Sequence, residues 1–591
     1  ISETFLDMLL AFLTMFAGIA LLVATFSIYN TFSIIVAQRT RQAALLRALG
    51  AVRGQVLRSV VAEALLVGIV ASLVGLVGGI GIAGLLKGLF DAVGFALPAG
   101  GTIVTTGTIV TGLVVGVIVT LLAGVFPAVK ASRIAPLAAI RDVAVERTTP
   151  SRARIVLGVA TAVIGIGTTL VAALGDEDML GVVGVGAVLT VVGAVVLGPV
   201  VARPAASLLG APVARLRGMT GGLARQNAVR NPRRTAGTSS ALMVGVAVVT
   251  LFTVFAASLQ ASLDDTIDRS FGGDLVVNSG VFGGGGISPE LATEVAALPE
   301  IDLAVGVGTG AAEIDGATKE MSITEPGELS RVLDLGVSDG SLDDLGDGMA
   351  VSEATATSNG WRVGDVVPVT FADGQTEDLT IGATYETDEI AGGYLLPRTV
   401  WTPHAVQDVD AMVMVEAAEG TSVTEAKEAV TRVADRFGGP EVEDRTEFAA
   451  TMTTGVDMML GIIYALLALA IVIALMGIAN TLSLSIHERT RELGLLRAVG
   501  QTRRQVRSMV RWESVVIATF GTVAGIGLGV FLGWALVQAV GTASGGLGVF
   551  ALPAGRLAVV LVVGAVAGVL AGVRPSRRAA RLDVLAAIGT E

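Results

Sequence analysis

The chain lacks several residue types from which functional sites are commonly built. It has no cysteine, which excludes a disulfide and a thiolate metal site. Its two histidines, His404 and His487, lie far apart in the sequence, so a histidine-based metal site is not expected. With four Trp and four Tyr in 591 residues, a carbohydrate-stacking surface has little support. The pattern G-x-x-x-x-G-K-[ST] does not occur, which excludes ATP binding through a P-loop.

Charged residues are also scarce, whereas apolar residues are abundant. Only 16% of the residues are charged and 52% are hydrophobic, with a mean hydropathy of +0.75. A helix needs about 20 apolar residues to cross a bilayer core, and buried helices of a soluble protein would not leave uncharged stretches as long as these. We predict nine membrane spans, at roughly 8–36, 60–87, 103–127, 155–174, 179–202, 238–261, 456–486, 514–540 and 557–573.

The formal net charge of −12 hides a strong segregation of charge along the chain. The block 262–450 carries 37 Asp and Glu against 9 Lys and Arg. Most basic residues fall in five short segments, at 37–58, 130–154, 203–234, 487–511 and 574–581. Because cytoplasmic loops collect Arg and Lys, the nine spans thread with these five segments inside and with 262–450 outside.

A membrane unit is duplicated within the chain. Residues 30–63 and 480–513 align at a constant offset of 450 positions, with 16 of 34 residues identical. The motif FALPAG recurs at 95–100 and 550–555, and LAAI recurs at 137–140 and 585–588. In each copy a long apolar run is followed by a short Arg-rich amphipathic stretch and then by two more apolar runs.

These observations predict five regions. They are a first three-span unit at 1–142, a two-span linker region at 143–203, a basic elbow with the sixth span at 204–261, an outer domain at 262–450, and a second three-span unit at 451–591. Residues 1–8 resemble the junction at 447–458, where the outer domain meets the second unit. We therefore expect a complete protein to carry one more span, the tenth, and a second outer domain upstream.

The outer domain has the pattern of a mixed α/β fold. Residues 272–278 and 411–417 have the alternation or β-branched content of strands, and 361–385 resemble a hairpin. Residues 288–299 and 421–437 have helical spacing and begin with Ser or Thr near a Glu, which is typical of a capped helix start.

The amphipathic stretch of each unit is its most informative part. In 488–504 the apolar residues recur near helical spacing, and Gly500 stands where a helix would end. A positively charged cytoplasmic loop without a partner would explain the arginines. It would not explain why one pattern of acidic, basic, glycine and apolar positions occurs twice. A short helix that docks into another protein's groove explains the repetition better.

The stretch ERTRELGLLRAVG at 488–500 closely resembles the cytoplasmic motif of FtsX-like permeases, the membrane subunits of ABC transporters of the MacB and lipoprotein-releasing type. The resemblance covers both three-span units. Residues 224–247 resemble the segment that enters the second half in double-length members, and 351–369 are similar to the family's outer core domain. The resemblance implies an α-helical polytopic protein of the bacterial cytoplasmic (inner) membrane, with two FtsX-like units and an α/β extracytoplasmic core domain.

The resemblance also implies two coupling helices, at 38–54 and 488–504, each docked on an ABC ATPase. The residues that form or border the second one are Glu488, Arg489, Arg491, Glu492, Gly494, Arg497 and Gly500. The matching residues of the first are Gln38, Arg39, Arg41, Gln42, Ala44, Arg47 and Gly50. In the first copy two acids are Gln and one Gly is Ala, so neutral contacts replace charge-assisted ones and weaker or asymmetric docking is expected.

The chain is expected to be a non-catalytic subunit. ATP and Mg would be bound by a separate ABC ATPase homodimer, one dimer per chain, because both halves lie in one polypeptide. Asn30 and Asn480 occupy equivalent positions at the ends of the long spans and are interpreted as interhelical hydrogen-bonding residues. Glu63 and Glu513 are equivalent acids at the start of the next spans, where a carboxylate suits a helix N-terminus.

Two functions remain open from the sequence. One is an ABC permease that relays ATP-driven movement to its outer domain, for export or extraction of a lipid, lipoprotein, peptide or drug. The other is a signalling subunit that senses a peptide or activates a cell-wall hydrolase. An ion-coupled transporter is disfavoured, because the spans carry no buried chain of acids and bases. Segment 203–234 suits anionic membrane lipids or an elbow helix on the inner leaflet, and nucleic-acid binding is not needed to explain it.

Overall fold

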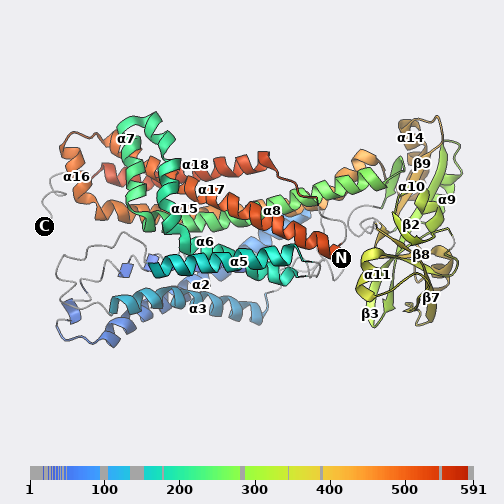
Figure 1. Cartoon of the computed structure of the whole chain (residues 1–591), viewed down its shortest axis with the longest axis horizontal. Coiled ribbons are helices and arrows are strands. Elements are labelled where there is room, and N and C mark those ends of the chain that lie inside the picture. The colour runs from blue at the N-terminus through green and yellow to red at the C-terminus, as the bar shows by residue number, and fades with distance from the viewer. Residues whose placement is uncertain are drawn as a thin grey trace.

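The computed structural model describes residues 51–92, 104–132, 152–175, 179–279, 286–343, 345–386, 391–544 and 549–582, and part of 17–50. The molecule is elongated, with a long helical region and an outer domain at one end (Figure 1). The long helices and their bounds are α2 (Arg53–Ala92), α3 (Thr106–Ser132), α5 (Arg152–Ala173), α6 (Leu180–Leu209), α7 (Ala211–Arg230), α8 (Pro232–Ser270), α15 (Arg445–Glu488), α17 (Arg503–Ser544) and α18 (Ala554–Ala580).

The helical region confirms seven of the predicted membrane spans. Among the described residues, seven helices are long and apolar enough to cross a membrane: α2, α3, α5, α6, α8, α17 and α18. The predicted span 456–486 lies within the single helix α15. The predicted span 8–36 lies mostly outside the described residues, although every described residue between 17 and 47 is helical. In the helical region α8 packs against both α15 and α17, α17 packs against α18, and α2 packs against α3.

The outer domain is built on one ten-stranded mixed sheet with short helices, as the α/β prediction requires. Its strands follow the order β10-β1-β9-β2-β3-β8-β5-β7-β4, and β6 pairs with β2 and β7. Their bounds are β1 (Leu275–Asn278), β2 (Ile301–Ile314), β3 (Ala317–Thr324), β4 (Val337–Gly340), β5 (Met349–Ser352), β6 (Val366–Thr370), β7 (Thr376–Tyr385), β8 (Tyr394–Pro397), β9 (Asp410–Ala417) and β10 (Glu441–Asp444). The helices are α9 (Glu290–Ala296), α10 (Pro326–Val332), α11 (Glu353–Asn359), α13 (Arg398–Trp401) and α14 (Val423–Ala434).

Local signals in the sequence explain several of these elements. The predicted hairpin is the antiparallel pair β6–β7, and its turn holds Gly374 at φ +83°. Because an L side chain rarely adopts that conformation, glycine suits this turn. Helix α14 begins with a capping box in which Ser422 and Glu425 bond to each other's backbone N–H groups.

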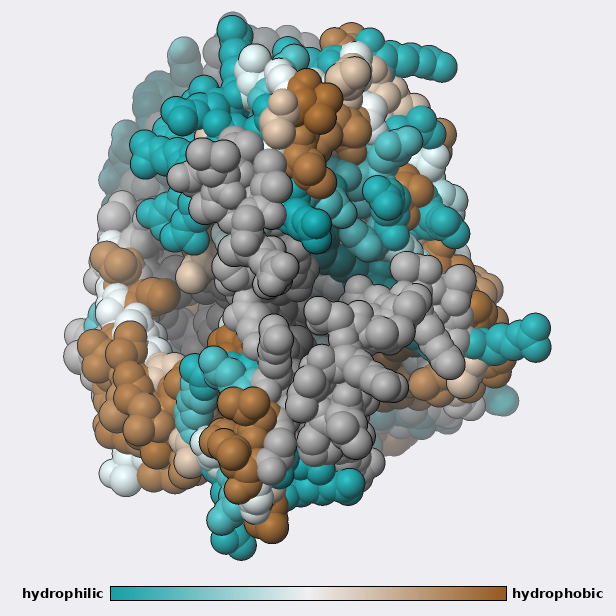
Figure 2. All heavy atoms as spheres, turned by 90° about the vertical axis from the view of Figure 1, so that its left-hand side faces the viewer, coloured by the Kyte–Doolittle hydropathy of each residue, from teal (hydrophilic) through white to brown (hydrophobic). Residues whose placement is uncertain are grey.

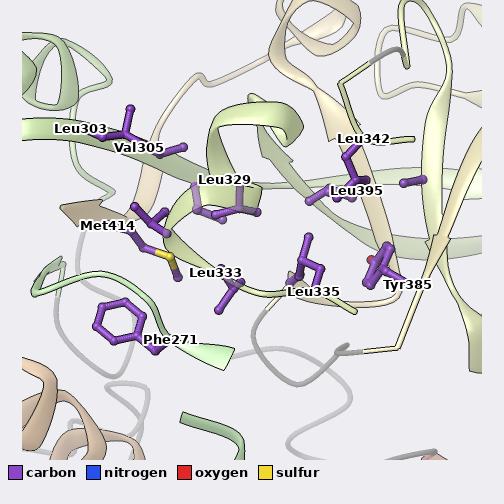
Figure 3. Close-up of a cluster of buried hydrophobic side chains, with 14 of the residues drawn as sticks. Phe271, Leu303, Val305, Leu329, Leu333, Leu335, Leu342, Tyr385, Leu395 and Met414 are labelled. Atoms are coloured by element: carbon purple, nitrogen blue, oxygen red, sulfur yellow. The ribbon is translucent and has the colours of Figure 1, made fainter. Parts of the chain in front are cut away.

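The core of the outer domain includes residues from the two helices that enter it. Buried side chains from β2, α10, β8 and β9 gather around Leu329 and Leu333 (Figure 3). Ile267 of α8 and Phe448 of α15 belong to the same cluster and are 3% and 0% exposed. The rings of Phe271 and Phe448 lie 5.9 Å apart. Both membrane helices are therefore anchored in the packed interior of the domain.

Candidate coupling site

The amphipathic stretch of the second unit lies at the end of the molecule opposite the outer domain (Figure 1). Helix α15 ends at Glu488, and Arg489 has non-helical angles (φ −103°, ψ 20°). The nine-residue helix α16 (Thr490–Ala498) follows, and α17 begins at Arg503. The predicted coupling stretch 488–504 is therefore a short helix between two breaks.

A left-handed glycine produces the second break, and the first unit repeats it. Gly500 has φ +108° and Gly50 has φ +107°. The N–H of Gly500 donates to the Arg497 carbonyl at 3.1 Å, and that of Gly50 donates to the Arg47 carbonyl at 3.1 Å. Since only glycine adopts this conformation without strain, both sequence copies specify the same reversal.

The helix that follows each reversal also begins in the same way. The Gln505 side chain accepts a hydrogen bond from the Thr502 backbone N–H at 2.8 Å. Gln55 accepts the equivalent bond from Val52 at 3.0 Å. The duplication is thus one of backbone geometry as well as of sequence.

Helix α16 has an inner apolar face that holds it on the helical region. Leu493 is 2% exposed, and Gly494 is buried beside it. Leu493 packs with side chains from α7, α15, α17 and α18: Ala224, Ile486, Val506, Met509, Val510 and Ala579. Displacement of α16 would therefore move or disrupt several helices together.

The outer face of α16 exposes apolar side chains at the end of the molecule opposite the outer domain. We call this exposed turn the tip of the second unit, and the equivalent turn around Leu45 and Leu49 the tip of the first. Leu495 is 49% exposed and Val499 is 88% exposed. The equivalent residues of the first unit, Leu45 and Leu49, are 58% and 79% exposed. In the space-filling view of this end, hydrophobic patches lie among hydrophilic side chains (Figure 2). Each unit therefore presents apolar surface at the same structural position.

A polar network ties α16 to three neighbouring helices. Arg489 donates to Glu492 Oε2 at 2.7 Å and to Asn227 Oδ1 at 2.9 Å. Asn227, from α7, donates to Glu513 Oε2 at 3.2 Å. Arg234, from α8, pairs with Glu513 Oε1 at 3.0 Å. The Glu513 side chain is only 4% exposed, so these partners satisfy a buried carboxylate.

In the first unit the equivalent residues make different contacts. Arg39 and Glu63, the counterparts of Arg489 and Glu513, form a direct ion pair of 2.7 Å. Their side chains are 57% and 43% exposed. An exposed pair of this kind is worth little, whereas the buried network of the second unit is costly to break. The two units are therefore alike in backbone and unlike in electrostatics.

The remaining predicted residues take varied positions. Arg491 and Glu492 are exposed, whereas Arg497 is partly buried and donates to the Leu582 carbonyl beyond α18. Gln42 is exposed and Arg47 is partly buried. The predicted residues Asn30 and Arg41, and the side chains of Asn480 and Glu488, lie outside the described residues.

Sequence reasoning missed Asn227 and Arg234 as site residues. Both lie in the basic segment 203–234, whose sequence suits binding to anionic lipids or an elbow helix on the inner leaflet. Within that segment Arg217 lies over the ring of Trp512, at 5.2 Å from the ring centroid. Arg225 donates to the Ser207 hydroxyl at 2.7 Å. Basic side chains alone give no signal of these contacts, and the partners of Arg217, Asn227 and Arg234 lie in helices far away in the sequence.

No group of three or more His, Cys, Asp or Glu that could hold a metal occurs in the part of the chain that the structure describes. Charged and apolar side chains are available at the tip, and a buried polar network lies behind them.

Two family models match the chain. The model of the FtsX-like permease C-terminal region matches twice, at residues 14–136 and 464–584. The model of the MacB-like periplasmic core domain matches residues 235–433. Together they cover most of the chain. The fold and these matches define a multi-pass membrane protein with a duplicated permease unit and a periplasmic-type core domain. The chain belongs to the FtsX-like ABC transporter permeases of the MacB type.

Several relatives share this description. An uncharacterized ABC transporter permease of Mycobacterium tuberculosis is 25% identical over 98% of this chain and 70% of its own length. The uncharacterized permease YknZ of Bacillus subtilis is 32% identical over 28% of this chain and 41% of its own. The pyoverdine export ATP-binding/permease protein PvdT of Pseudomonas fluorescens is 30% identical over 30% of this chain and 27% of its own. This chain thus spans less than half the length of YknZ and of PvdT.

Among solved structures, the periplasmic region of MacB from Actinobacillus actinomycetemcomitans matches 31% of this chain and 94% of its own length. That match has a TM-score of 0.26 and 10% sequence identity.

Proposed function

We propose that this chain is the membrane subunit of an ABC transporter and relays the movement of a separate ATPase homodimer to its outer domain. The observation that carries the proposal is the continuity of α15. Its 44 residues correspond to about 66 Å of unbroken helix. Phe448, near one end, is buried in the outer core, and Ile486, near the other, packs against α16. A displacement of α16 is therefore transmitted along one stiff element.

Helix α8 packs against α15 and forms a second long helix between the α16 end and the outer domain. We call α15 and α8 the two rods. Arg234, in its first turn, belongs to the polar network behind α16. Ile267, in its last turns, belongs to the core of the outer domain. The Arg445 side chain donates to the Ile267 carbonyl at 3.0 Å and joins the two rods where they enter that domain. Two linked rods transmit rotation as well as translation.

We further propose that the exposed tips dock on the ATPase. Interfaces commonly have an apolar centre with a polar rim, and Leu495 and Val499 beside Arg491 and Glu492 fit that arrangement. The proposed docking residues of the two units are Arg39, Arg41, Gln42, Arg47, Gly50, Glu488, Arg491, Glu492, Gly494, Arg497 and Gly500. ATP and Mg belong to the partner, and two tips on one chain match the two subunits of one ATPase dimer. Arg489 is assigned instead to positioning α16, because its guanidinium binds Asn227 and Glu492.

The proposed setting is the bacterial cytoplasmic membrane, with the α16 end inside and the acidic outer domain outside. The concentration of Arg in the predicted inner segments supports this orientation. For the cargo we propose export or extraction of a lipid, lipoprotein, peptide or drug at the outer side. A relative named for pyoverdine export supports an exported substrate.

The docking proposal is tested with one substitution made at opposite ends of the molecule. Val499→Asp places a carboxylate at a tip position that is 88% exposed. Val406→Asp makes the same change in the outer domain, where the side chain is 79% exposed. The chain is purified from its native membrane, and co-purifying ATPase is quantified by mass spectrometry. We expect two ATPase subunits per wild-type chain, loss of the ATPase from Val499→Asp and retention by Val406→Asp.

Retention of the ATPase by Val499→Asp at the wild-type ratio would refute docking at the tip. The same purified complex separates transport from signalling. Stimulation of its ATPase by lipid vesicles or peptides supports transport. Stimulation only when an outer partner protein is bound would favour a signalling subunit and contradict the transport proposal.

A further inference from the structure

The second copy of the motif FALPAG, in the connection between α17 and α18, contacts the outer part of α8. The backbone N–H of Val549 donates to Ser262 Oγ at 3.3 Å, and that of Ala551 donates to Ser258 Oγ at 3.0 Å. Ser258 Oγ in turn donates to the Ala551 carbonyl at 3.4 Å. The first copy of the motif, at 95–100, lies outside the described residues.

The two partners of this contact have matching spacings. Val549 and Ala551 are two residues apart, which is about 6.6 Å in an extended chain. Ser258 and Ser262 are four residues apart on α8, which is about one turn and about 6 Å. Pro553 disfavours helical angles at the residue before it, so α18 begins only beyond the contact. Each of the two hydroxyls therefore meets one N–H group of the segment.

The two serines differ from the serines near the inner end of α8 in what they bond. Ser239 and Ser240 are buried, and their hydroxyls donate to the Ala236 carbonyl of the same helix. Hydroxyl side chains on helices commonly make such local bonds. Ser258 and Ser262 are each 1% exposed, and they bond instead to backbone that lies 293 and 287 positions away. Their hydroxyls therefore join α8 to a distant part of the chain.

The contact lies between two other attachments of α8. On its inner side α17 approaches α8 closely as far as Val254, where a Cβ added to Gly533 would lie 2.9 Å from the Val254 Cβ. On its outer side Ile267 belongs to the core of the outer domain. Both serines lie within this stretch of about 20 Å of helix, at the outer end of the predicted sixth span. The segment therefore holds α8 where the helix leaves the membrane region.

We propose that Ser258 and Ser262 are positioning residues that fix residues 549–551 to α8, and we call this contact the outer clamp. Arg556 adds a bond to Gln260 Oε1 at 3.4 Å, between the two serines. The inference rests on the proposed function, in which α8 carries movement to the outer domain. A rod that is held where it leaves the second unit passes its displacement to the outer domain. A rod that is released there loses displacement by bending away from its neighbours.

Hydrogen exchange tests the contact itself, because a backbone N–H exchanges slowly while it is bonded. Ser258→Ala with Ser262→Ala removes both acceptors and retains both Cβ atoms. One hydrogen bond shifts such an equilibrium by about fivefold, so the amides of 549–551 should exchange about 25-fold faster in the double variant. The control, Ser239→Ala with Ser240→Ala, removes two buried hydroxyls from the same helix and should leave the exchange of those amides unchanged.

Spin-label distances test the role of the clamp in movement. The chain has no cysteine, so labels are attached at Val406→Cys in the outer domain and Val559→Cys on α18, where the side chains are 79% and 61% exposed. The labelled chain is combined with its co-purifying ATPase in lipid nanodiscs. The label distance is measured by pulsed EPR with and without a non-hydrolysable ATP analogue. We expect the analogue to shift the distance with intact serines and in the control, and the Ser258→Ala, Ser262→Ala variant to lose most of the shift while it still binds the ATPase.

The outcomes separate the clamp from the relay on which it depends. Unchanged amide exchange in the Ser258→Ala, Ser262→Ala variant would overturn the proposal, and so would faster exchange with an undiminished distance shift. Absence of any shift with intact serines would refute the relay, and the clamp's part in it with it. Ala551→Pro removes one donor from the segment and leaves α8 unchanged. It should also reduce the shift, and an undiminished shift there would overturn the proposal even if the serine variant does not fold.

Discussion

The buried ion pair behind α16 supports the most decisive stability prediction. Arg234→Met retains an apolar side chain of similar length and removes the charge that Glu513 faces at 3.0 Å. Breaking a buried pair from one side costs about 3–5 kcal/mol, because the other charge remains buried without compensation. The Arg234 side chain is 17% exposed, so we expect the lower end, about 3 kcal/mol.

The first unit provides a matched control for this change. Arg39→Met removes the same charge from the ion pair with Glu63. The side chains of Arg39 and Glu63 are 57% and 43% exposed. We expect a cost below about 1 kcal/mol there, because exposed pairs are screened by water. The assay is unfolding by SDS in mixed micelles, followed by the fluorescence of Trp512, which is adjacent to Glu513.

A double substitution tests the cause of the effect. Arg234→Met with Glu513→Leu removes both charges, and we expect it to recover most of the stability lost in Arg234→Met alone. If Arg234→Met costs no more than Arg39→Met, the buried network does not stabilise the α16 end and the reasoning fails. If the double variant is less stable than either single variant, desolvation of Glu513 is not the source of the cost.

Three further predictions follow from local geometry. The hydrogen bond to the Asp373 carboxylate raises the pKa of His404 above its ordinary 6.5. The charged histidine therefore stabilises the outer domain below pH 6.5, and this contribution to stability is lost as the pH rises through the raised pKa. His404→Gln should flatten the pH dependence of thermal unfolding in that range. Leu493→Ala should lower the free energy of unfolding by about 3 kcal/mol, whereas Val499→Ala, at an exposed site, should change it by less than about 0.5 kcal/mol in the same SDS titration. Gly500→Ala should cost about 2 kcal/mol from backbone strain at φ +108°, and unchanged stability would contradict the left-handed turn.

The unequal electrostatics of the two tips bear on how one ATPase dimer acts on one chain. Both tips expose apolar residues at equivalent positions, so each can dock. Behind the second tip Arg489 binds Asn227 of α7, which binds Glu513 of α17, the partner of Arg234 of α8; among the described residues, the side chain bound by Arg39 is Glu63. Under the proposed function, force on the second tip reaches the outer domain through two rods. Charge reversal at Arg489 and Arg491 should therefore uncouple the ATPase more than charge reversal at Arg39 and Arg41, and equal loss in an ATPase assay would contradict this.

The sequence was sufficient for features that depend on local pattern. Apolar runs of spanning length predicted the membrane helices, because hydrophobic length is a local property. The repeat at 450 positions predicted the shared turn, and Gly50 and Gly500 both adopt positive φ in the structure. Capping residues predicted the start of α14, since Ser422 and Glu425 lie three positions apart.

The tertiary structure alone decided which side chains meet across the fold. The motif predicts Arg489 as a coupling residue, and only the structure shows that it binds Asn227, 262 positions away in the sequence. Gly75 and Gly525 have the same helical pattern, yet Gly525 is covered by α8 and Gly75 is exposed. Pattern determines which face of a helix is able to pack closely, whereas the partner that covers that face depends on packing between distant segments, which no local signal encodes.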